Sequence, residues 1–531
     1  MNVIQKKILI TDPIESNCIE ILTNNGFFVH YKPGLKEDEI IKIIKDYHVL
    51  IVRSGTKVTK RIIESSLNLE LIARAGAGVD NIDVDAATRK GIIVMNTPGG
   101  NTLSTAEHTM ALLLSMCRNI PLANFELKQG IWDRKKYIGT ELFGKKIGII
   151  GLGKIGKEVA HRCNAFGMEV LGYDPLITQE VASKFGVKLV SFDELISNSD
   201  IITVHVPLSE ETKNLIGKEE LEKCKDGVKI INCARGGIVN EKALLDGLKS
   251  GKVSSVALDV FENEPPQFPN ELITHPKVVA TPHIGASTKE AQEKVAIQIA
   301  QQIVDYFSTN NLIGAVNAYP LHQKITEEIK PFIKLSETLG KFVSQISSEN
   351  VSKINFQYFG SLLHKYRETL SAAFLMGYLS KKISANVNFV NAQTLAEETG
   401  IQINEILESD NSTYKNLITI NCSMSSKNFI ISGTLFGKDE IRIVQINEFN
   451  MDIKPSKYML LYENIDRPGM LAAVGNILAS ENVNIAGLSL GRFKMGDKAL
   501  TLMNLDNPIN TTILNKLSNI DGVGEINFIE I

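Results

Sequence analysis

The stretch KIGIIGLGKIGKEVAHRCNAFG, residues 146–167, decides the fold class of this 531-residue chain. Its first five residues are mostly apolar and predict a buried strand, and the glycine-rich turn GLGKIG follows at once. The remaining residues predict a helix that Gly167 ends. In such a turn Gly151 permits the sharp bend, Gly153 lets an anion approach the helix N-terminus, and Gly156 allows the helix to pack closely on the strand. The stretch therefore predicts a dinucleotide-binding unit.

The next apolar run, MEVLGYD, ends at Asp174, at the distance where a carboxylate binds the ribose hydroxyls of a dinucleotide. No arginine follows it in YDPLIT, so a 2′-phosphate would be repelled and NAD is favoured over NADP. A purely structural glycine turn is the alternative. The strand, the helix and the carboxylate in register make that alternative weak.

Strand-like and helix-like stretches alternate over residues 7–98 and again over residues 145–282, which predicts an α/β fold with two doubly wound parallel sheets. Long helices are predicted at 101–118 and 287–307, with capping boxes at Ser104/Glu107 and Ser287/Glu290. One long helix thus lies before the second lobe and one after it. This arrangement predicts that the second lobe (101–285) is inserted into the first (1–100 and 286–318). Residues 319–455 have mixed patterns, and residues 456–531 predict a compact βαββαβ unit.

Composition excludes several classes of protein. Apolar residues make up 44% and charged residues 22%, and the net charge is −3 without a basic tail, which argues against a nucleic-acid or membrane-surface partner. The 6 cysteines are scattered and include no C-x-x-C, so no metal site is expected and a reducing compartment fits best. No apolar stretch is long enough to span a membrane, and the expected location is the cytoplasm.

In an open parallel sheet, ligands bind beyond the carboxyl ends of the strands. Three residues near such ends in the second lobe suit chemistry: Arg235 in NCARGG, Glu264 in DVFENEPP and His283 in TPHIGAS. Each has a more ordinary local interpretation, as a loop-anchoring arginine, a solvated acid or a packing histidine. Together they match the needs of hydride transfer to a keto group, since a histidine held by a carboxylate donates the proton and an arginine anchors the substrate.

The motifs GLGKIG, NCARGG, DVFENEP and TPHIGAST, in this order, resemble the D-isomer-specific 2-hydroxyacid dehydrogenases over residues 5–318. The resemblance implies that Arg235 anchors the substrate, Glu264 orients His283, and His283 is the catalytic acid and base. It also implies an NAD site, whose residues are Gly151, Gly153, Lys154, Ile155, Gly156, Asp174, Val206, Pro207, Cys233, Ala234, Arg235, Asp259, His283, Gly285 and Ala286.

Within that family, VRSGTKVT, RAGAGVDNIDV and NTPGGNTLSTAE resemble the long members that oxidise 3-phospho-D-glycerate to 3-phosphohydroxypyruvate, the first committed step of L-serine synthesis. The likeness implies a substrate side lined by Arg53, Ser54, Arg74 and Asn101. An arginine pair suits a substrate with a phosphate and a carboxylate, although Arg74 at a strand end also has a structural interpretation. By the same likeness, WDRKKYIG supplies Arg134 or Lys135 to the substrate of a neighbouring subunit.

The C-terminal motifs YENIDRPGM and NVNIAG resemble an ACT domain, and VNFVNAQTLAEETGI resembles the intervening regulatory domain of the long members. The likeness implies a homotetramer with L-serine as effector, at positions matching Asn464, Asp466 and Asn484. Only Asn484 keeps the residue of the serine-inhibited pattern. An ACT domain that serves only as an assembly contact therefore stays open.

Two alternatives remain at this point. The chain could act on another substrate, as a glyoxylate or hydroxypyruvate reductase or a D-lactate enzyme, but such relatives generally end near residue 320. It could also be a non-catalytic NAD-sensing scaffold, since such proteins share the fold and keep the three catalytic residues.

Overall fold

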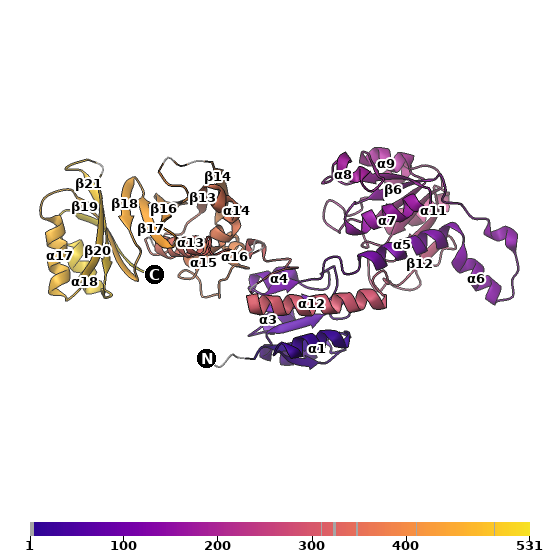
Figure 1. The fold of residues 1–531 in the computed structure, drawn as a ribbon, viewed down its shortest axis with the longest axis horizontal. Coiled ribbons are helices and arrows are strands. Elements are labelled where there is room, and N and C mark those ends of the chain that lie inside the picture. The colour runs from indigo at the N-terminus through magenta and orange to yellow at the C-terminus, as the bar shows by residue number, and fades with distance from the viewer. Residues whose placement is uncertain are drawn as a thin grey trace. The chain divides into compact units, whose positions relative to one another are not determined.

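The computed structural model describes residues 5–309, 311–321, 325–346, 349–409, 411, 413–492 and 494–531. Its contacts divide the chain into two compact units. The first, here called the inserted unit, comprises residues 14–18 and 97–298. The second, the flanking unit, comprises residues 1–13, 19–96 and 299–531. Figure 1 shows the helices and strands of both units.

The flanking unit begins with a five-stranded parallel sheet in the order β2-β1-β3-β4-β5, the flavodoxin-like order. Its strands are short and apolar, and all four residues of β3 are buried. The strands are β1 (Lys7–Ile10), β2 (Phe28–Tyr31), β3 (Val49–Val52), β4 (Leu71–Arg74) and β5 (Ile93–Met95). The helices are α1 (Ser16–Asn24), α2 (Glu37–Ile43), η1 (Ile44–Asp46), α3 (Lys60–Ser65) and α4 (Val84–Arg89).

The chain returns to this sheet after the inserted unit, at Val316 and Asn317. The Val316 backbone N–H donates to the Val94 carbonyl oxygen at 2.8 Å. The Asn317 side chain accepts from the Val94 N–H at 2.8 Å and donates to the Ile92 carbonyl at 2.9 Å. These bonds satisfy the polar groups of the edge strand β5.

The inserted unit contains a seven-stranded sheet in the order β12-β11-β10-β9-β6-β7-β8, parallel throughout. Apolar clusters cover both faces: α5 and α7 contribute to one, and α9, α10 and α11 to the other. The strands are β6 (Lys146–Ile150), β7 (Glu169–Tyr173), β8 (Lys188–Leu189), β9 (Ile201–Val204), β10 (Val228–Asn232), β11 (Val253–Leu258) and β12 (Val278–Ala280). The helices are α5 (Thr102–Cys117), α6 (Ile120–Lys128), η2 (Arg134–Tyr137), α7 (Lys154–Ala165), α8 (Gln179–Ser183), α9 (Phe192–Asn198), α10 (Lys218–Lys223), α11 (Glu241–Ser250) and α12 (Lys289–Thr309), of which α12 continues into the flanking unit.

Both long helices form, but the two predicted capping boxes are wrong. Helix α5 begins one residue after Asn101, so Ser104 is already inside it, and its hydroxyl donates to the Asn101 carbonyl at 3.0 Å. At α12 the Thr288 hydroxyl accepts the Ala291 N–H at 3.2 Å. The Ser287 N–H donates to the Ile284 carbonyl instead, so this residue belongs to the preceding turn.

Residues 330–453 of the flanking unit form an α+β layer with a six-stranded mixed sheet in the order β14-β13-β15-β16-β17-β18. Only the β13–β14 pair is parallel. The strands are β13 (Lys353–Phe359), β14 (Gln402–Glu408), β15 (Leu417–Ser423), β16 (Asn428–Phe436), β17 (Glu440–Ile446) and β18 (Phe449–Ile453). The helices are α13 (Lys330–Val343), α14 (Ser361–Lys365), α15 (Arg367–Leu379) and α16 (Ala392–Glu398), with η3 (Tyr319–Leu321) before them.

The C-terminal residues form the predicted βαββαβ unit, with a ferredoxin-like antiparallel sheet in the order β20-β21-β19-β22. Helices α17 and α18 cover one face around Val474, Leu478 and Leu517. The elements are β19 (Tyr458–Ile465), α17 (Met470–Ser480), β20 (Ile485–Arg492), β21 (Lys498–Leu505), α18 (Thr511–Ser518) and β22 (Val523–Glu530). Of the described helices, none combines the length and apolar character that crossing a membrane requires.

Candidate active site

The GLGKIG turn links β6 to α7 at the point where the strand order of the inserted unit reverses. Gly151 has a φ of +90°, and a Cβ at Gly156 would lie 2.0 Å from the Gly151 carbonyl oxygen, so the turn and the helix contact both require glycine. A Cβ at Gly153 would meet nothing within 4 Å, which leaves open space at the N-terminus of α7. Free N–H groups and the helix dipole favour an anion there. This geometry fits the pyrophosphate of a dinucleotide.

Asp174 follows β7 and holds the glycine-rich turn. Its carboxylate accepts the Leu152 N–H at 2.9 Å and the Leu176 N–H at 2.9 Å. Val206 and Pro207 follow β9, the neighbour of β6 on its other side. The side chain of Lys154 donates to the Pro98 carbonyl at 3.2 Å, and Ile155 is half-buried. The predicted dinucleotide residues therefore surround one edge of the sheet.

The loop that carries Arg235 is held by Asn232, which sequence reasoning did not single out. Asn232 is 2% exposed; its side chain accepts the Ala234 N–H at 3.0 Å and donates to the Arg235 carbonyl at 2.8 Å. A Cβ at Gly236 would lie 1.8 Å from the Phe261 carbonyl oxygen. The Arg235 loop therefore packs directly on the loop that leads to Glu264. Cys233 is buried, and burial raises the pKa of its thiol to about 12, so it is not a nucleophile.

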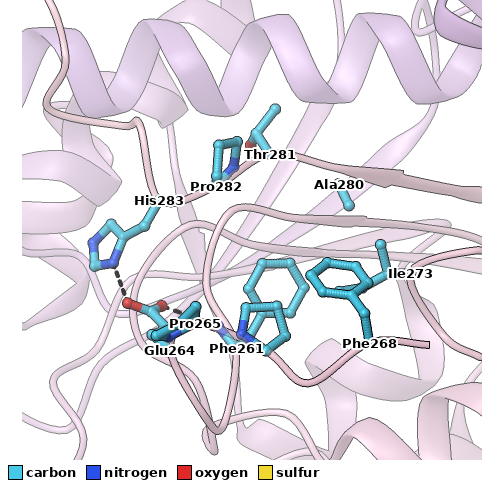
Figure 2. Close-up of a pocket in the computed structure, with 10 residues that line it drawn as sticks. Phe261, Glu264, Pro265, Phe268, Ile273, Ala280, Thr281, Pro282 and His283 are labelled. Carbon is cyan, nitrogen blue, oxygen red and sulfur yellow. Dashed lines mark hydrogen bonds and ion pairs between the residues drawn. The ribbon is translucent and has the colours of Figure 1, made fainter. Parts of the chain in front are cut away.

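His283 and Glu264 form a direct pair (Figure 2). The His283 Nδ1 atom lies 2.6 Å from Glu264 Oε2, while Glu264 Oε1 accepts the Phe261 N–H at 3.1 Å. The hydrogen bond to Glu264 raises the pKa of His283, against burial and the charge of Arg235, and the charges of Glu264 and Asp259 add to the rise. Burial raises the pKa of Glu264, but the bond to His283, the charge of His283, the Phe261 N–H and the charge of Arg235 outweigh it and hold that pKa low. Glu264 thus engages Nδ1 of the ring, which leaves Nε2 as the ring nitrogen for proton transfer.

A cavity of about 480 Å³ adjoins this pair. Figure 2 shows His283 and Glu264 at one end of it and the rings of Phe261 and Phe268 beside Ile273 at the other. Its walls are mostly apolar, and they are formed by Phe261, Glu264, Pro265, Pro266, Phe268, Ile273, Ala280, Thr281, Pro282 and His283. The apolar walls adjoin the pair on one side, while 47% of the His283 side chain and 36% of the Glu264 side chain remain exposed.

Asp259 and the residues after His283 form one tight turn. Asp259 is 1% exposed and accepts the Ile284 and Gly285 N–H groups, each at 2.8 Å. Burial raises the pKa of Asp259, but its four hydrogen bonds outweigh burial, so the pKa is lowered and the carboxylate is charged. Gly285 is buried and Ala286 is exposed beside it.

The predicted substrate residues of the flanking unit lie together. Arg74 Nε donates to Asn81 Oδ1 at 2.8 Å, and Asn81 Nδ2 donates to the Arg53 carbonyl at 2.7 Å. The Arg53 N–H donates to Asp12 at 2.5 Å, and Ser54 beside it is exposed. Asn81 therefore joins the two arginines, a role that its place in RAGAGVDNIDV did not reveal. Asn101 belongs to the inserted unit, where it occupies the N-cap position of α5 without a side-chain capping bond.

The three predicted effector positions do not meet within one chain. Asn464 and Asp466 lie at the end of the C-terminal sheet where Asn464 pairs with Ala499, and Asp466 forms an ion pair with Arg492 at 3.3 Å. Asn484 precedes β20 at the opposite end and donates to Asp506 at 2.7 Å. Among the described residues, no group of three His, Cys, Asp or Glu side chains is arranged to hold a metal ion.

Two family models match the chain. Residues 110–285 match the NAD binding domain of the D-isomer specific 2-hydroxyacid dehydrogenases, and residues 328–447 match the D-3-phosphoglycerate dehydrogenase intervening domain. The chain is 42% identical to the D-3-phosphoglycerate dehydrogenase of Archaeoglobus fulgidus, over 99% of this chain and 100% of the relative. The chain belongs to the D-3-phosphoglycerate dehydrogenase family. The enzyme of that name from Bacillus subtilis is 40% identical over 99% of each chain.

Solved structures of other 2-hydroxyacid dehydrogenases match a shorter part of this D-3-phosphoglycerate dehydrogenase family member. A glyoxylate reductase from Paecilomyes thermophila has a TM-score of 0.54 and 32% identity, covering 59% of this chain and 99% of its own. The D-lactate dehydrogenase from Aquifex aeolicus, complexed with NAD and lactic acid, has a TM-score of 0.52 and 29% identity, covering 58% of this chain and 98% of its own. These neighbours confirm the α/β fold and the NAD-binding class. The D-3-phosphoglycerate dehydrogenases match this chain over nearly its full length, whereas these neighbours match only 58–59% of it.

Proposed function

We propose that this chain catalyses the NAD-dependent oxidation of 3-phospho-D-glycerate to 3-phosphohydroxypyruvate, the first committed step of L-serine synthesis. The observation that carries the proposal is the His283–Glu264 pair, with Nδ1 and Oε2 at 2.6 Å, beside the Arg235 loop. Relatives named D-3-phosphoglycerate dehydrogenase that match nearly the whole chain support this substrate over lactate or glyoxylate.

In the proposed reaction, His283 Nε2 removes the proton of the substrate hydroxyl, and Glu264 stabilises the imidazolium that forms. NAD, when bound, accepts the hydride from the carbon that bears this hydroxyl. Arg235 binds the substrate carboxylate and the developing carbonyl oxygen through its planar guanidinium. In the reverse direction the imidazolium returns the proton. The three side chains thus supply the base, its orienting acid and the anchor.

The residues proposed to hold NAD fit it on two grounds. The open space at Gly153 accommodates a pyrophosphate, and the Asp174 carboxylate is a natural partner for ribose hydroxyls. The other proposed contacts are Gly151, Lys154, Ile155, Gly156, Val206, Pro207, Cys233, Ala234, Arg235, Asp259, His283, Gly285 and Ala286.

Arg53 and Arg74 are proposed to bind the phosphate and carboxylate of the substrate, with Ser54 and Asn101 as further hydrogen-bonding groups. Arg134 or Lys135, next to the exposed Trp132 (78%), is proposed to reach the substrate of a neighbouring subunit. Phe125 (58%) and Leu127 (54%) of α6 are also exposed, which supports burial of this segment in an oligomer.

The domain boundaries proposed are 1–100 with 286–318 for the substrate domain, 101–285 for the NAD domain, 319–455 for the intervening domain and 456–531 for an ACT domain.

A homotetramer is proposed, with L-serine as a candidate effector. In that assembly, Asn464 and Asp466 of one chain would meet Asn484 of another. A cytoplasmic location is proposed because all six cysteines are free and buried.

The test is a steady-state assay of NADH formation with 3-phospho-D-glycerate, D-glycerate, D-lactate and glycolate, with and without L-serine. We expect turnover with 3-phospho-D-glycerate and little with the others. Turnover with lactate or glycolate but none with phosphoglycerate contradicts the proposed substrate. His283→Ala should lose most of the turnover and keep NADH binding, measured by fluorescence; an unchanged rate contradicts the proposed base.

A further inference from the structure

The turn that carries His283 has an unfavourable backbone conformation. His283 has a φ of +52°, in the left-handed region that residues other than glycine seldom occupy. Neighbouring groups must hold the turn in this conformation, because a non-glycine residue keeps a positive φ only where its surroundings fix it. Figure 2 shows Thr281 and His283 on either side of Pro282, with His283 pointing toward Glu264.

Asp259 fastens the turn on both sides of His283. Its Oδ1 atom accepts the Thr281 hydroxyl at 2.7 Å and the Ile284 N–H at 2.8 Å, and its Oδ2 atom accepts the Gly285 N–H at 2.8 Å. The carboxylate is buried, so its own position has to be fixed by side chains around it.

His108 of α5 is a further side chain that contacts this carboxylate. Its Nε2 atom lies 3.2 Å from Asp259 Oδ1 and 3.1 Å from Thr281 Oγ1, and 16% of its side chain is exposed. The Thr281 hydroxyl proton is already donated to Asp259, so toward His108 this oxygen can only accept. The ionised Asp259 can only accept as well. His108 Nε2 therefore carries a proton and donates to both oxygens.

We propose that His108 is a positioning residue for the proton transfer: its Nε2–H fixes Asp259 and Thr281, and through them the turn that presents His283 to Glu264. This inference rests on the proposed function of His283. His108 has no contact with the Glu264 pair itself that the described hydrogen bonds show, so it acts through the turn.

The consequence for His283 follows from the groups that face it. These are Glu264, which holds Nδ1, Asp259 beneath the turn, and Arg235 from the neighbouring loop. If Asp259 releases the Ile284 and Gly285 amides, the turn relaxes and the bond to Glu264 lengthens. The pKa of His283 then falls toward its ordinary value, since that bond is the main cause of its rise.

The test compares His108→Phe, which keeps a ring but removes the donor, with His108→Gln, whose amide N–H can replace Nε2–H. His161→Gln on the exposed side of α7 is the control. We expect His108→Phe to lower kcat by about tenfold to a hundredfold, as displaced catalytic groups do, with a smaller change in KM. The acid limb of its pH profile for oxidation should move to lower pH. His108→Gln should restore most of the rate and the wild-type pH profile.

A structural role alone would lower the thermal midpoint of both variants and leave the pH profile unchanged, and that result overturns the proposal. Equal losses in the Phe and Gln variants overturn it too. If His108→Phe does not fold, Thr281→Val removes the other side-chain donor to Asp259 Oδ1 and should shift the profile in the same direction; an unshifted profile again overturns the proposal.

A readout that does not depend on turnover separates this inference from the proposed function. With ¹³C-labelled histidine, the His283 resonance is identified by its loss in His283→Ala and titrated by NMR in the full-length protein. If the wild type fails to oxidise 3-phospho-D-glycerate while the His283 titration moves in His108→Phe and returns in His108→Gln, the proposed substrate is wrong and the role of His108 stands. A titration that does not move overturns the role of His108.

Discussion

Replacing Glu264 with glutamine tests how the carboxylate controls His283. Glutamine fills the same space and still accepts a hydrogen bond, but it carries no charge. A charge-assisted hydrogen bond contributes about 1.5–3 kcal/mol. Because 47% of the His283 side chain and 36% of the Glu264 side chain are exposed, solvent screening favours the lower figure, about 1.5 kcal/mol. A loss of this size corresponds to about tenfold in rate.

The direction of the pH effect follows from the same contact. Oxidation needs the neutral imidazole as base, so kcat/KM for oxidation rises as the pH passes upward through the pKa of His283. The bond to Glu264 raises that pKa, so its weakening in Glu264→Gln moves the rise to lower pH, and the plateau at high pH falls about tenfold. Reduction needs the imidazolium, and its decline with rising pH should also move to lower pH.

The assay follows NADH absorbance in both directions across a pH series. Glu262→Gln is the matched control, because Glu262 lies in the same loop but exchanges hydrogen bonds with Glu241 instead of a histidine. It should keep the wild-type profile. A Glu264→Gln profile whose rise stays in place or moves to higher pH would refute the reasoning, because the carboxylate would then not set the charge of His283.

Three further substitutions test other parts of the site. Asp174→Ala should raise the KM for NAD about tenfold or more at nearly constant kcat, since a charged acceptor is lost; an unchanged KM in steady-state kinetics argues against a ribose contact. Asn81→Ala removes the acceptor of Arg74 Nε and should raise the KM for 3-phospho-D-glycerate about tenfold while NADH affinity, measured by fluorescence, stays the same. In Gly236→Ala the new Cβ would lie 1.8 Å from the Phe261 carbonyl. Thermal denaturation should show a loss of about 1–3 kcal/mol together with lower activity; a variant of wild-type stability contradicts the close packing of the two loops.

Much of the fold could be predicted because its signals are local. The strand at 146–150, its glycine turn and the following helix lie within one continuous stretch. Other elements lack such signals. Helix α4 has six residues without an apolar period, and β8 has two residues. The capping box at Ser104 was wrong because a serine three residues before an acid also occurs one turn inside a helix, where its hydroxyl bonds to the backbone instead. The one at Ser287 was wrong because the neighbouring Thr288 accepts the N–H at the start of α12.

In the site too, residues in local sequence motifs could be predicted, whereas residues whose roles depend on distant parts of the chain could not. Arg235, Glu264 and His283 stand in short motifs in the loops that follow β10, β11 and β12, so the sequence marks them. Asn232 and His108 do not stand out, because their roles depend on which loop or helix lies opposite. Asn232 looks like the end of a strand, and His108 looks like one histidine in a long apolar helix.

The acids that hold the functional loops share one arrangement. This arrangement explains why their role in holding those loops cannot be read from the sequence alone. Asp174 follows β7 and binds an N–H of the turn after β6; Asp259 follows β11 and binds N–H groups after β12; Asp12 follows β1 and binds the Arg53 N–H after β3. In each case the two strands are paired in parallel. Loops after paired parallel strands leave the sheet at the same edge with unpaired N–H groups, and a carboxylate from the neighbouring strand end satisfies them. The functional residue and the acid that holds it are therefore adjacent in the sheet but distant in the chain. The sequence marks Asp174 and Asp259 as cofactor residues, but the loops that they hold are recognised only once the strand order is known.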